Sequence, residues 1–257
     1  SIADPFLPKK IEEGRLEEIR ECIGCNICYT GDSLGVPIRC TQNPAIGEEW
    51  RRGWHPETIT KKGSESSVLV VGAGPAGLEA ARALGQRGYR VTLAEATREL
   101  GGRVTHESTL PGLGEWLRVR DYRVQQIDAM SNVEVFRESE LSVDEVLAVE
   151  ADHIVISTGA TWRADGFGRN HPQPLTTLSP SAQILTPDDV MAGRLPDGPT
   201  VIFDDDSFYM GGVIAERVRR ENVPVTVVTP ENVVSEWCEH TAEQYQVQKH
   251  LLELGIR

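Results

Sequence analysis

The order of apolar and polar residues along the chain predicts an α/β protein with parallel strands. Residues 68–71 form an apolar run rich in valine, which suits a strand buried on both faces. A glycine-rich turn at 72–77 leads into a helix over 75–86, and a second strand follows at 91–94. This succession of strand, helix and strand is the pattern of a βαβ unit.

The same pattern starts again about 130 residues later, at domain scale. A strand, turn and helix are predicted from 200 to 222, with another strand at 225–228. Between the two repeats, Ser142 to Glu145 has the spacing of a capping box that opens a short helix. A further buried strand is predicted at 154–157. Another short helix begins at Thr186, with proline at its first position.

Both ends of the chain suggest a segment of a longer polypeptide. At the start, residues 1–8 are an apolar, proline-containing stretch with no strand before it to pack on. Residues 10–20 are then predicted to form one short amphipathic helix, because Ile11, Leu16 and Ile19 share a face. Residues 246–255 are predicted to form a helix that ends at Gly255, with a strand starting at Ile256.

Four of the five cysteines lie close together and predict a metal site. Cys22, Cys25, Cys28 and Cys40 have the spacing C-x2-C-x2-C-x11-C. Three evenly spaced thiolates and a more distant fourth suit a [4Fe–4S] cluster, and Gly24 lets the backbone turn tightly between them. Zinc remains an alternative, although it favours pairs of C-x2-C knuckles. The other alternative is a set of buried free cysteines.

The turn from Gly72 to Gly77 predicts a site for the diphosphate of an adenine nucleotide. It has the G-x-G-x-x-G spacing directly after a strand and opens a helix. Gly72 makes the turn, Gly74 lets a diphosphate approach, and Gly77 lets helix and strand pack closely. Glu95 closes the second strand, where a carboxylate accepts hydrogen bonds from ribose hydroxyls and disfavours a 2′-phosphate.

The second repeat lacks the glycines of a nucleotide site. Asp204, Asp205 and Asp206 stand where a diphosphate would lie, and two like charges about 5 Å apart cost about 3 kcal/mol at an effective dielectric constant of about 20. We therefore expect this half to keep the fold without binding a nicotinamide nucleotide, its carboxylates forming a solvated acidic turn.

Composition and charge exclude some classes of function. The net charge is −13, which disfavours binding to nucleic acid or to an anionic membrane surface. The longest apolar stretch, 68–84, is interrupted by charged residues and glycines, so no membrane span is predicted. Clustered cysteines without a secretory signal predict a cytoplasmic protein.

Two further motifs extend a resemblance to known flavoproteins. Gly101-Gly102-Arg103 and Thr158-Gly159 resemble motifs of the two-dinucleotide-binding flavoproteins, which include glutathione reductase. The nucleotide-binding residues implied by all these motifs are Gly72, Gly74, Pro75, Ala76, Gly77, Glu95, Ala96, Gly102, Arg103, Thr158 and Gly159.

The motifs ECIGCNIC, RCTQNPAIGEEWRRGWHPE and PGLGEW make the whole chain resemble the iron–sulfur flavoprotein amine dehydrogenases. This family includes trimethylamine, dimethylamine and histamine dehydrogenases, and the overall resemblance favours the last. It implies four parts: the end of an FMN-binding (β/α)8 barrel (1–20), a [4Fe–4S] segment with a linker (21–63), an ADP- or FAD-type nucleotide domain (64–196) and an incomplete, degenerate NAD-type domain (197–257).

The resemblance also implies a function for the full-length protein. FMN in the missing barrel oxidises a small amine, electrons leave through the cluster to an acceptor such as an electron-transfer flavoprotein, and ADP fills the nucleotide site. The resemblance implies a homodimer, with catalytic residues outside this chain, so the chain alone is expected to be inactive. Two alternatives remain: part of an NAD(P)H-dependent enoate or dienoyl-CoA reductase, and a non-catalytic electron-transfer module.

Overall fold

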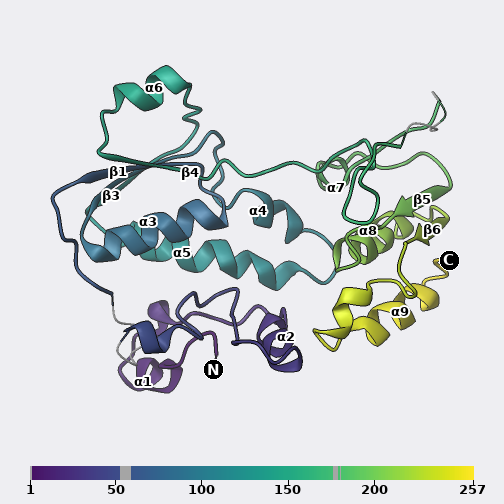
Figure 1. The fold of residues 1–257 in the computed structure, drawn as a ribbon, viewed down its shortest axis with the longest axis horizontal. Coiled ribbons are helices and arrows are strands. Elements are labelled where there is room, and N and C mark those ends of the chain that lie inside the picture. The colour runs from purple at the N-terminus through teal and green to yellow at the C-terminus, as the bar shows by residue number, and fades with distance from the viewer. Residues whose placement is uncertain (1, 53–58, 176–178, 180) are drawn as a thin grey trace. The chain divides into compact units, whose positions relative to one another are not determined.

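The chain forms two compact units. The computed structural model, drawn in Figure 1, describes residues 2–52, 59–175, 179 and 181–257. The first unit takes residues 1–25, 37–108 and 115–159, and the second takes residues 26–36, 109–114 and 160–257. The domain boundary expected at 196–197 remains a prediction, because these units reflect compactness alone.

The first unit is an α/β layer structure of the Rossmann-like type. Its elements are α1 (Leu7–Glu12), η1 (Leu16–Glu18), η2 (Glu49–Arg52), β1 (Ser67–Val71), α3 (Pro75–Arg87), β2 (Arg90–Ala94), α4 (Arg103–Glu107), η3 (Gly114–Leu117), α5 (Arg118–Asp128), β3 (Val133–Phe136), α6 (Val143–Ala148) and β4 (His153–Ile156). The four strands are parallel and lie in the order β3-β2-β1-β4.

The position of β1 explains its sequence. It pairs with β2 on one side and β4 on the other, so that Val70 lies opposite Leu93 and Val155. Helices α3 and α5 cover one face of the sheet and α6 lies over the other (Figure 1). Leu69 and Val70, which point to opposite faces, are therefore both fully buried, and the predicted doubly buried strand is confirmed.

The second unit repeats the strand–helix–strand pattern on a smaller scale. Its elements are α2 (Ile27–Ser33), α7 (Pro187–Met191), β5 (Thr200–Phe203), α8 (Met210–Arg219), β6 (Val225–Val228), η4 (Glu236–Glu239) and α9 (Gln244–Glu253). Strands β5 and β6 are parallel, as the sequence predicts. After Gly255 the chain runs beside β6, because the amide of Val227 donates to the Arg257 carbonyl at 2.7 Å.

Local signals correctly located the starts of α6 and α7. Ser142 and Thr186 both form complete capping boxes, with Glu145 and Asp189 as their partners. The single helix predicted over 10–20 is wrong, because α1 ends at Glu12 and a short 3-10 turn, η1, follows. Gly14 has a left-handed φ of 71°, which ends the helix.

Within the described ranges, no helix is long and apolar enough to cross a membrane.

Candidate functional site

The glycine-rich turn lies at the carboxyl end of β1, where ligands bind in parallel α/β sheets. Gly72 has φ of 95°, and a Cβ there would lie 2.5 Å from the Ser157 carbonyl oxygen. The Ser157 hydroxyl donates to the Gly72 carbonyl at 2.8 Å. The turn from β1 into α3 is thus packed against the end of β4, which only glycine permits at this position.

Gly77 and Gly74 have different surroundings. A Cβ at Gly77 would overlap the Gly72 carbonyl oxygen and lie 2.6 Å from Ser157 Oγ, whereas a Cβ at Gly74 would have no heavy atom within 4 Å. Gly74 is the N-cap of the 13-residue helix α3, and Pro75 and Ala76 in its first turn are exposed. The open space therefore faces a helix N-terminus, a setting that attracts phosphate.

Glu95 is buried, and both its carboxylate oxygens accept hydrogen bonds from the chain itself. Oε2 accepts from the Ala73 amide at 2.7 Å, and Oε1 accepts from the Thr97 amide and hydroxyl, each at 2.9 Å. Each oxygen has more than one lone-pair direction, so the carboxylate can bind the turn and still accept from a ribose hydroxyl. Thr97 is not among the residues predicted from the sequence, although a hydroxyl residue two positions after an acid is a signal for such a local hydrogen bond.

The remaining predicted nucleotide residues lie at the same edge of the sheet. Gly101 donates its amide to the Ala73 carbonyl at 2.8 Å, and a Cβ at Gly102 would lie 3.1 Å from Gly74 Cα. Thr158 follows β4, with its Cα 3.1 Å from the Cβ position of Gly72. Three more predicted residues follow or begin neighbouring elements: Ala96, Arg103 and Gly159. The predicted set therefore converges on one open site, although nucleotide binding itself stays a prediction.

The first two cysteines lie on the surface of the first unit. Ile23 packs with Val104 and Val119, and Cys25 lies at the border of this small cluster. Arg118 donates to the Cys22 carbonyl at 2.9 Å. The Gly24 amide donates to Cys22 Sγ at 3.4 Å, which is the type of N–H···S contact that surrounds iron–sulfur clusters.

The fourth cysteine belongs to a segment that contacts the first two. Thr41 Oγ1 lies 3.1 Å from Cys25 Sγ. The next side chain, Gln42, donates to the carbonyl of Glu21 at 3.0 Å. The segments around Cys22–Cys25 and Cys40 are thus joined within the first unit.

Cys28 belongs to α2 in the second unit. Asn26, just before this helix, donates to the Thr241 carbonyl at 3.1 Å, and Thr30 donates to the His240 carbonyl at 3.3 Å. Asn26 has a left-handed φ of 51°, and the chain turns sharply there between two predicted ligands.

The donor set suits a metal centre. All five cysteines are free thiols, and none of the four predicted ligands is fully buried. Within the described ranges, no three His, Cys, Asp or Glu side chains are grouped closely enough to hold a metal ion. The four thiols, the left-handed turn residues and the N–H···S contact fit a [4Fe–4S] cluster, and the ligand assignment stays a prediction. Residues 53–57, at the end of the motif that follows Cys40, lie outside the described residues.

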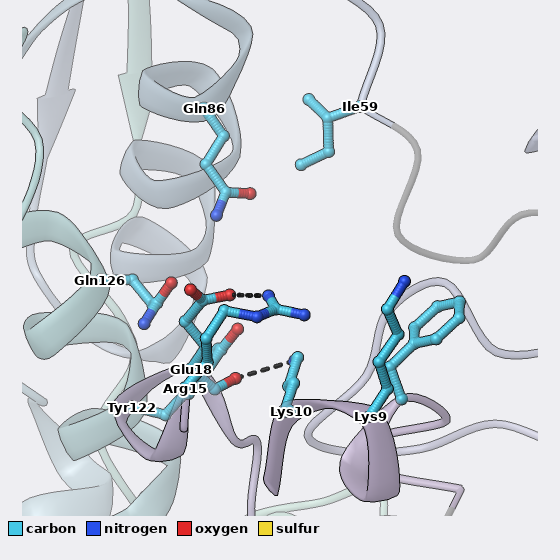
Figure 2. A pocket seen from close by; sticks show the side chains of 9 residues that line it. Lys9, Lys10, Arg15, Glu18, Ile59, Gln86, Tyr122 and Gln126 are labelled. Carbon is cyan, nitrogen blue, oxygen red and sulfur yellow. Dashed lines mark hydrogen bonds and ion pairs between the residues drawn. The ribbon is translucent and has the colours of Figure 1, made fainter. Parts of the chain in front are cut away.

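A separate pocket of about 360 Å³ opens in the first unit beside the N-terminal segment. Figure 2 shows Arg15 paired with Glu18, and Lys10 bonded to the Glu18 carbonyl. Gln86, which also lines the pocket, stands in the last turn of α3, about 18 Å along the helix from Gly74 at 1.5 Å per residue. This pocket is therefore distinct from the glycine-rich turn, and its buried lysine, Lys10, is already paired with Asp4 at 2.7 Å.

The acidic turn of the second unit is only partly solvated, which corrects the sequence prediction. Asp204 is 3% exposed and accepts a hydrogen bond from the Ser207 amide at 3.0 Å, while Asp206 is exposed. A Cβ at Gly211 would lie 2.6 Å from Asp204 Oδ2. Asp204 therefore fills the space next to the first turn of α8.

Burial raises the pKa values of two side chains in the second unit, Asp204 and Cys238. It raises the pKa of Asp204 to about 6, with the charges of Asp206 and Asp205 adding to the effect and the Ser207 amide opposing it. Burial, followed by the charge of Glu243, raises the pKa of the Cys238 thiol to about 12. Cys238 is thus a buried thiol that stays protonated at neutral pH, and a protonated thiol is a poor nucleophile.

Replacing Asp204 with Asn should stabilise the protein above pH 6 and have little effect at pH 4. The folded-state pKa of about 6 lies above the ordinary aspartate value of 3.8, so Asp204 loses its proton at a lower pH in the unfolded state than in the folded state. The free-energy cost of ionising Asp204 in the folded state therefore grows as pH rises between these two pKa values, and it reaches about 3 kcal/mol above pH 6. Urea unfolding at pH 4 and pH 8 measures it. An equal change in unfolding free energy at both pH values would contradict an ionisable, buried Asp204.

Comparison with known proteins places the chain among oxidoreductases. The pyridine nucleotide-disulphide oxidoreductase family matches residues 66–183. This range contains the glycine-rich turn, Glu95 and both additional glycine motifs, so the match agrees with the dinucleotide-binding fold of the first unit.

Similarity to individual amine-oxidising enzymes extends over the whole chain. Dimethylamine dehydrogenase of Hyphomicrobium sp. (strain x) is 42% identical over 265 residues, which cover 100% of this chain and 36% of that enzyme. The structure of histamine dehydrogenase from Rhizobium sp. 4-9 matches with 54% identity and a TM-score of 0.96, covering 100% of this chain and 38% of that one. The structure of 6-hydroxypseudooxynicotine amine oxidase from Pseudomonas geniculata N1 matches with 48% identity and a TM-score of 0.94, covering 100% of this chain and 39% of that one.

The chain thus spans less than two fifths of the length of these relatives. Because the similarity is continuous in both sequence and fold, the chain belongs to the amine dehydrogenase family that includes dimethylamine dehydrogenase and histamine dehydrogenase.

Proposed function

We propose that this chain is the nucleotide-binding and electron-exit part of a longer amine dehydrogenase. The observation that carries this proposal is the 54% identity and TM-score of 0.96 to histamine dehydrogenase over the whole chain. A reductase function has less support, because the 2-naphthoyl-CoA reductase structure is 28% identical with a TM-score of 0.75. The substrate is a small amine, such as histamine or trimethylamine, which FMN elsewhere in the protein oxidises.

In this proposal Cys22, Cys25, Cys28 and Cys40 hold a [4Fe–4S] cluster. When bound, the cluster supplies one-electron transfer between the flavin and an external acceptor, such as an electron-transfer flavoprotein. The Gly24 amide donates to Cys22 Sγ, and such donors stabilise the negative charge of ligating sulfur. The cysteine segment corresponds to 21–63, and residues 1–20 are the end of the FMN barrel.

The nucleotide domain, proposed at 64–196, binds ADP (or FAD) as a structural ligand. The N-terminus of α3 holds the diphosphate, Glu95 accepts from the ribose, and Gly102 and Thr158 border the site. The degenerate domain at 197–257 binds no nicotinamide nucleotide, because Asp204 fills the space beside Gly211 and adds negative charge. We further propose a cytoplasmic homodimer for the full-length protein.

The function is tested on the full-length protein, which should contain about four iron and four sulfide per chain. Replacing Cys22 with Ala should remove the cluster and abolish reduction of the acceptor. Anaerobic bleaching of the flavin by amine should remain, because substrate oxidation takes place before electrons reach the cluster. Stopped-flow absorbance separates the two steps.

Cys238 supplies the matched control, since it is a buried thiol outside the predicted set. Cys238→Ala should keep the iron, the sulfide and acceptor reduction. A folded Cys22→Ala protein that lacks the cluster and still reduces its acceptor at the normal rate would show that electrons leave directly from the flavin.

A further inference from the structure

We propose that Gln42 is a positioning residue of the four-cysteine site, fixing the backbone that carries Cys22 relative to the backbone that carries Cys40. This inference rests on the proposed function for the identity of the metal group. It goes beyond that function, because it assigns a role to a side chain that binds neither metal nor nucleotide.

Gln42 is almost completely buried and bridges two chain segments. Gln42 is 1% exposed, and its side-chain Nε2 donates to the Glu21 carbonyl at 3.0 Å. Glu21 directly precedes Cys22, and Gln42 follows Cys40 by two positions. One side-chain amide therefore ties together the first and last ligands of the predicted site.

The orientation of this amide is fixed by Arg123. Arg123 Nη1 donates to Gln42 Oε1 at 2.9 Å, and Nη2 donates to the Gln42 carbonyl at 3.4 Å. A guanidinium only donates and a backbone carbonyl only accepts. A side chain between them must therefore accept at one atom and donate at another, which Gln does and neither Glu nor an apolar residue of similar length can do.

Arg123 is itself held rigidly. It is 4% exposed, donates through Nε to Glu79 at 2.9 Å and through Nη1 to the Val119 carbonyl at 2.8 Å. Glu79 lies on α3, the helix whose N-terminus faces the nucleotide site. The cysteine segment thus shares its support with the nucleotide-binding helix.

The residues beside Gln42 are anchored in the same way. Asn43 is 1% exposed and donates to the Ile2 carbonyl at 3.3 Å. On the other side, Thr41 contacts Cys25 Sγ at 3.1 Å. Loss of the Gln42 bridge would leave the Glu21 carbonyl without this partner and allow the two cysteine segments to separate.

The test uses full-length protein with its metal group and two substitutions. Gln42→Glu keeps an acceptor for Arg123 but removes the donor to Glu21, and Gln42→Met removes both. In each variant, loss of the metal to a chelator should be about 10- to 100-fold faster, the range typical for residues that orient metal ligands. The reduction potential and the electron paramagnetic resonance spectrum of the cluster should also change.

Gln126→Ala is the matched control. Gln126 lies on α5, as Arg123 does, and like Gln42 it donates its amide to a backbone carbonyl, that of Glu17 at 3.4 Å, but this hydrogen bond is exposed to solvent. This variant should keep the wild-type rate of metal loss, potential and spectrum. Circular dichroism and ADP binding report whether each variant is folded.

Two results would overturn the inference. One is a folded Gln42→Glu protein with the wild-type rate of metal loss and an unchanged potential. The other is an unfolded Gln42→Glu protein, because that would make the residue a requirement of the fold rather than of the cysteine site. If the wild-type protein holds zinc, the proposed electron transfer fails, while the rate of zinc release from the same variants still tests Gln42.

Discussion

Replacing Glu79 with Gln should lower the unfolding free energy by about 3–5 kcal/mol, the usual cost of removing one partner from a buried ion pair. Glu79 accepts from Arg82 and from Arg123, and both guanidinium side chains are nearly buried, at 6% and 4% exposed. The substitution removes the negative charge that these two cations share. Urea unfolding at pH 7 measures the change.

The pH dependence of this loss has a definite sign. Burial alone would raise the pKa of Glu79, but the hydrogen bond and charge of Arg82, with the charge of Arg123, hold it below its usual value of 4.5. The carboxylate therefore stabilises the fold fully above pH 4.5, and its contribution is lost as pH falls through the lowered folded-state pKa. The difference between wild type and Glu79→Gln should accordingly shrink below pH 4.5.

An exposed ion pair provides the control. Arg217 and Glu221 lie on and just after α8, 2.6 Å apart, with side chains 29% and 48% exposed. Glu221→Gln should cost less than about 1 kcal/mol. Equal losses for the two substitutions would show that the network around Glu79 is no more stabilising than a surface pair.

Gly77→Ala should destabilise the protein by about 1–3 kcal/mol or more, as overpacking does, whereas Gly74→Ala should affect nucleotide binding instead. A Cβ at Gly77 would overlap the backbone oxygen of Gly72, which cannot move without breaking the turn. A Cβ at Gly74 meets no protein atom within 4 Å. It would occupy the space in which the diphosphate is proposed to lie.

The two glycine variants are compared by urea unfolding and by calorimetry with ADP. Gly74→Ala should stay within about 1 kcal/mol of wild type in stability, the cost of alanine at an N-cap, and bind ADP at least about tenfold more weakly, since one lost contact of 1.4 kcal/mol has that effect. Unchanged ADP affinity in Gly74→Ala would place the nucleotide elsewhere.

Features that depend on short stretches of chain could be predicted from the sequence. The run at 68–71 predicted β1, because a strand between two others and under helices on both faces must be apolar throughout. The glycine spacing located the turn at 72–77, and the helix starts at Ser142 and Thr186 were both predicted. These signals are local, since each arises from the backbone geometry of a few consecutive residues.

Some elements escaped prediction because their local pattern is weak. Helix α5 buries Arg123 together with the apolar residues Val119, Tyr122 and Ile127, which reverses the usual rule that arginine faces water. Strand β3 is four residues long, with alternating exposure. The helix predicted over 10–20 failed for the opposite reason. Its apolar periodicity continues past Gly14, but the helical backbone ends before that residue, which has a left-handed φ.

By itself, the sequence determined the α/β architecture, the glycine-rich turn and the four candidate metal ligands, because each of these depends on the spacing of residues along the chain. Only the tertiary structure decided which polar groups are buried and paired. Gln42, Glu79 and Arg123 are far apart in sequence, yet they form one hydrogen-bonded chain. Asp204 was expected in solvent and is buried instead. Burial and pairing depend on segments that meet only after folding, and no local pattern encodes that meeting.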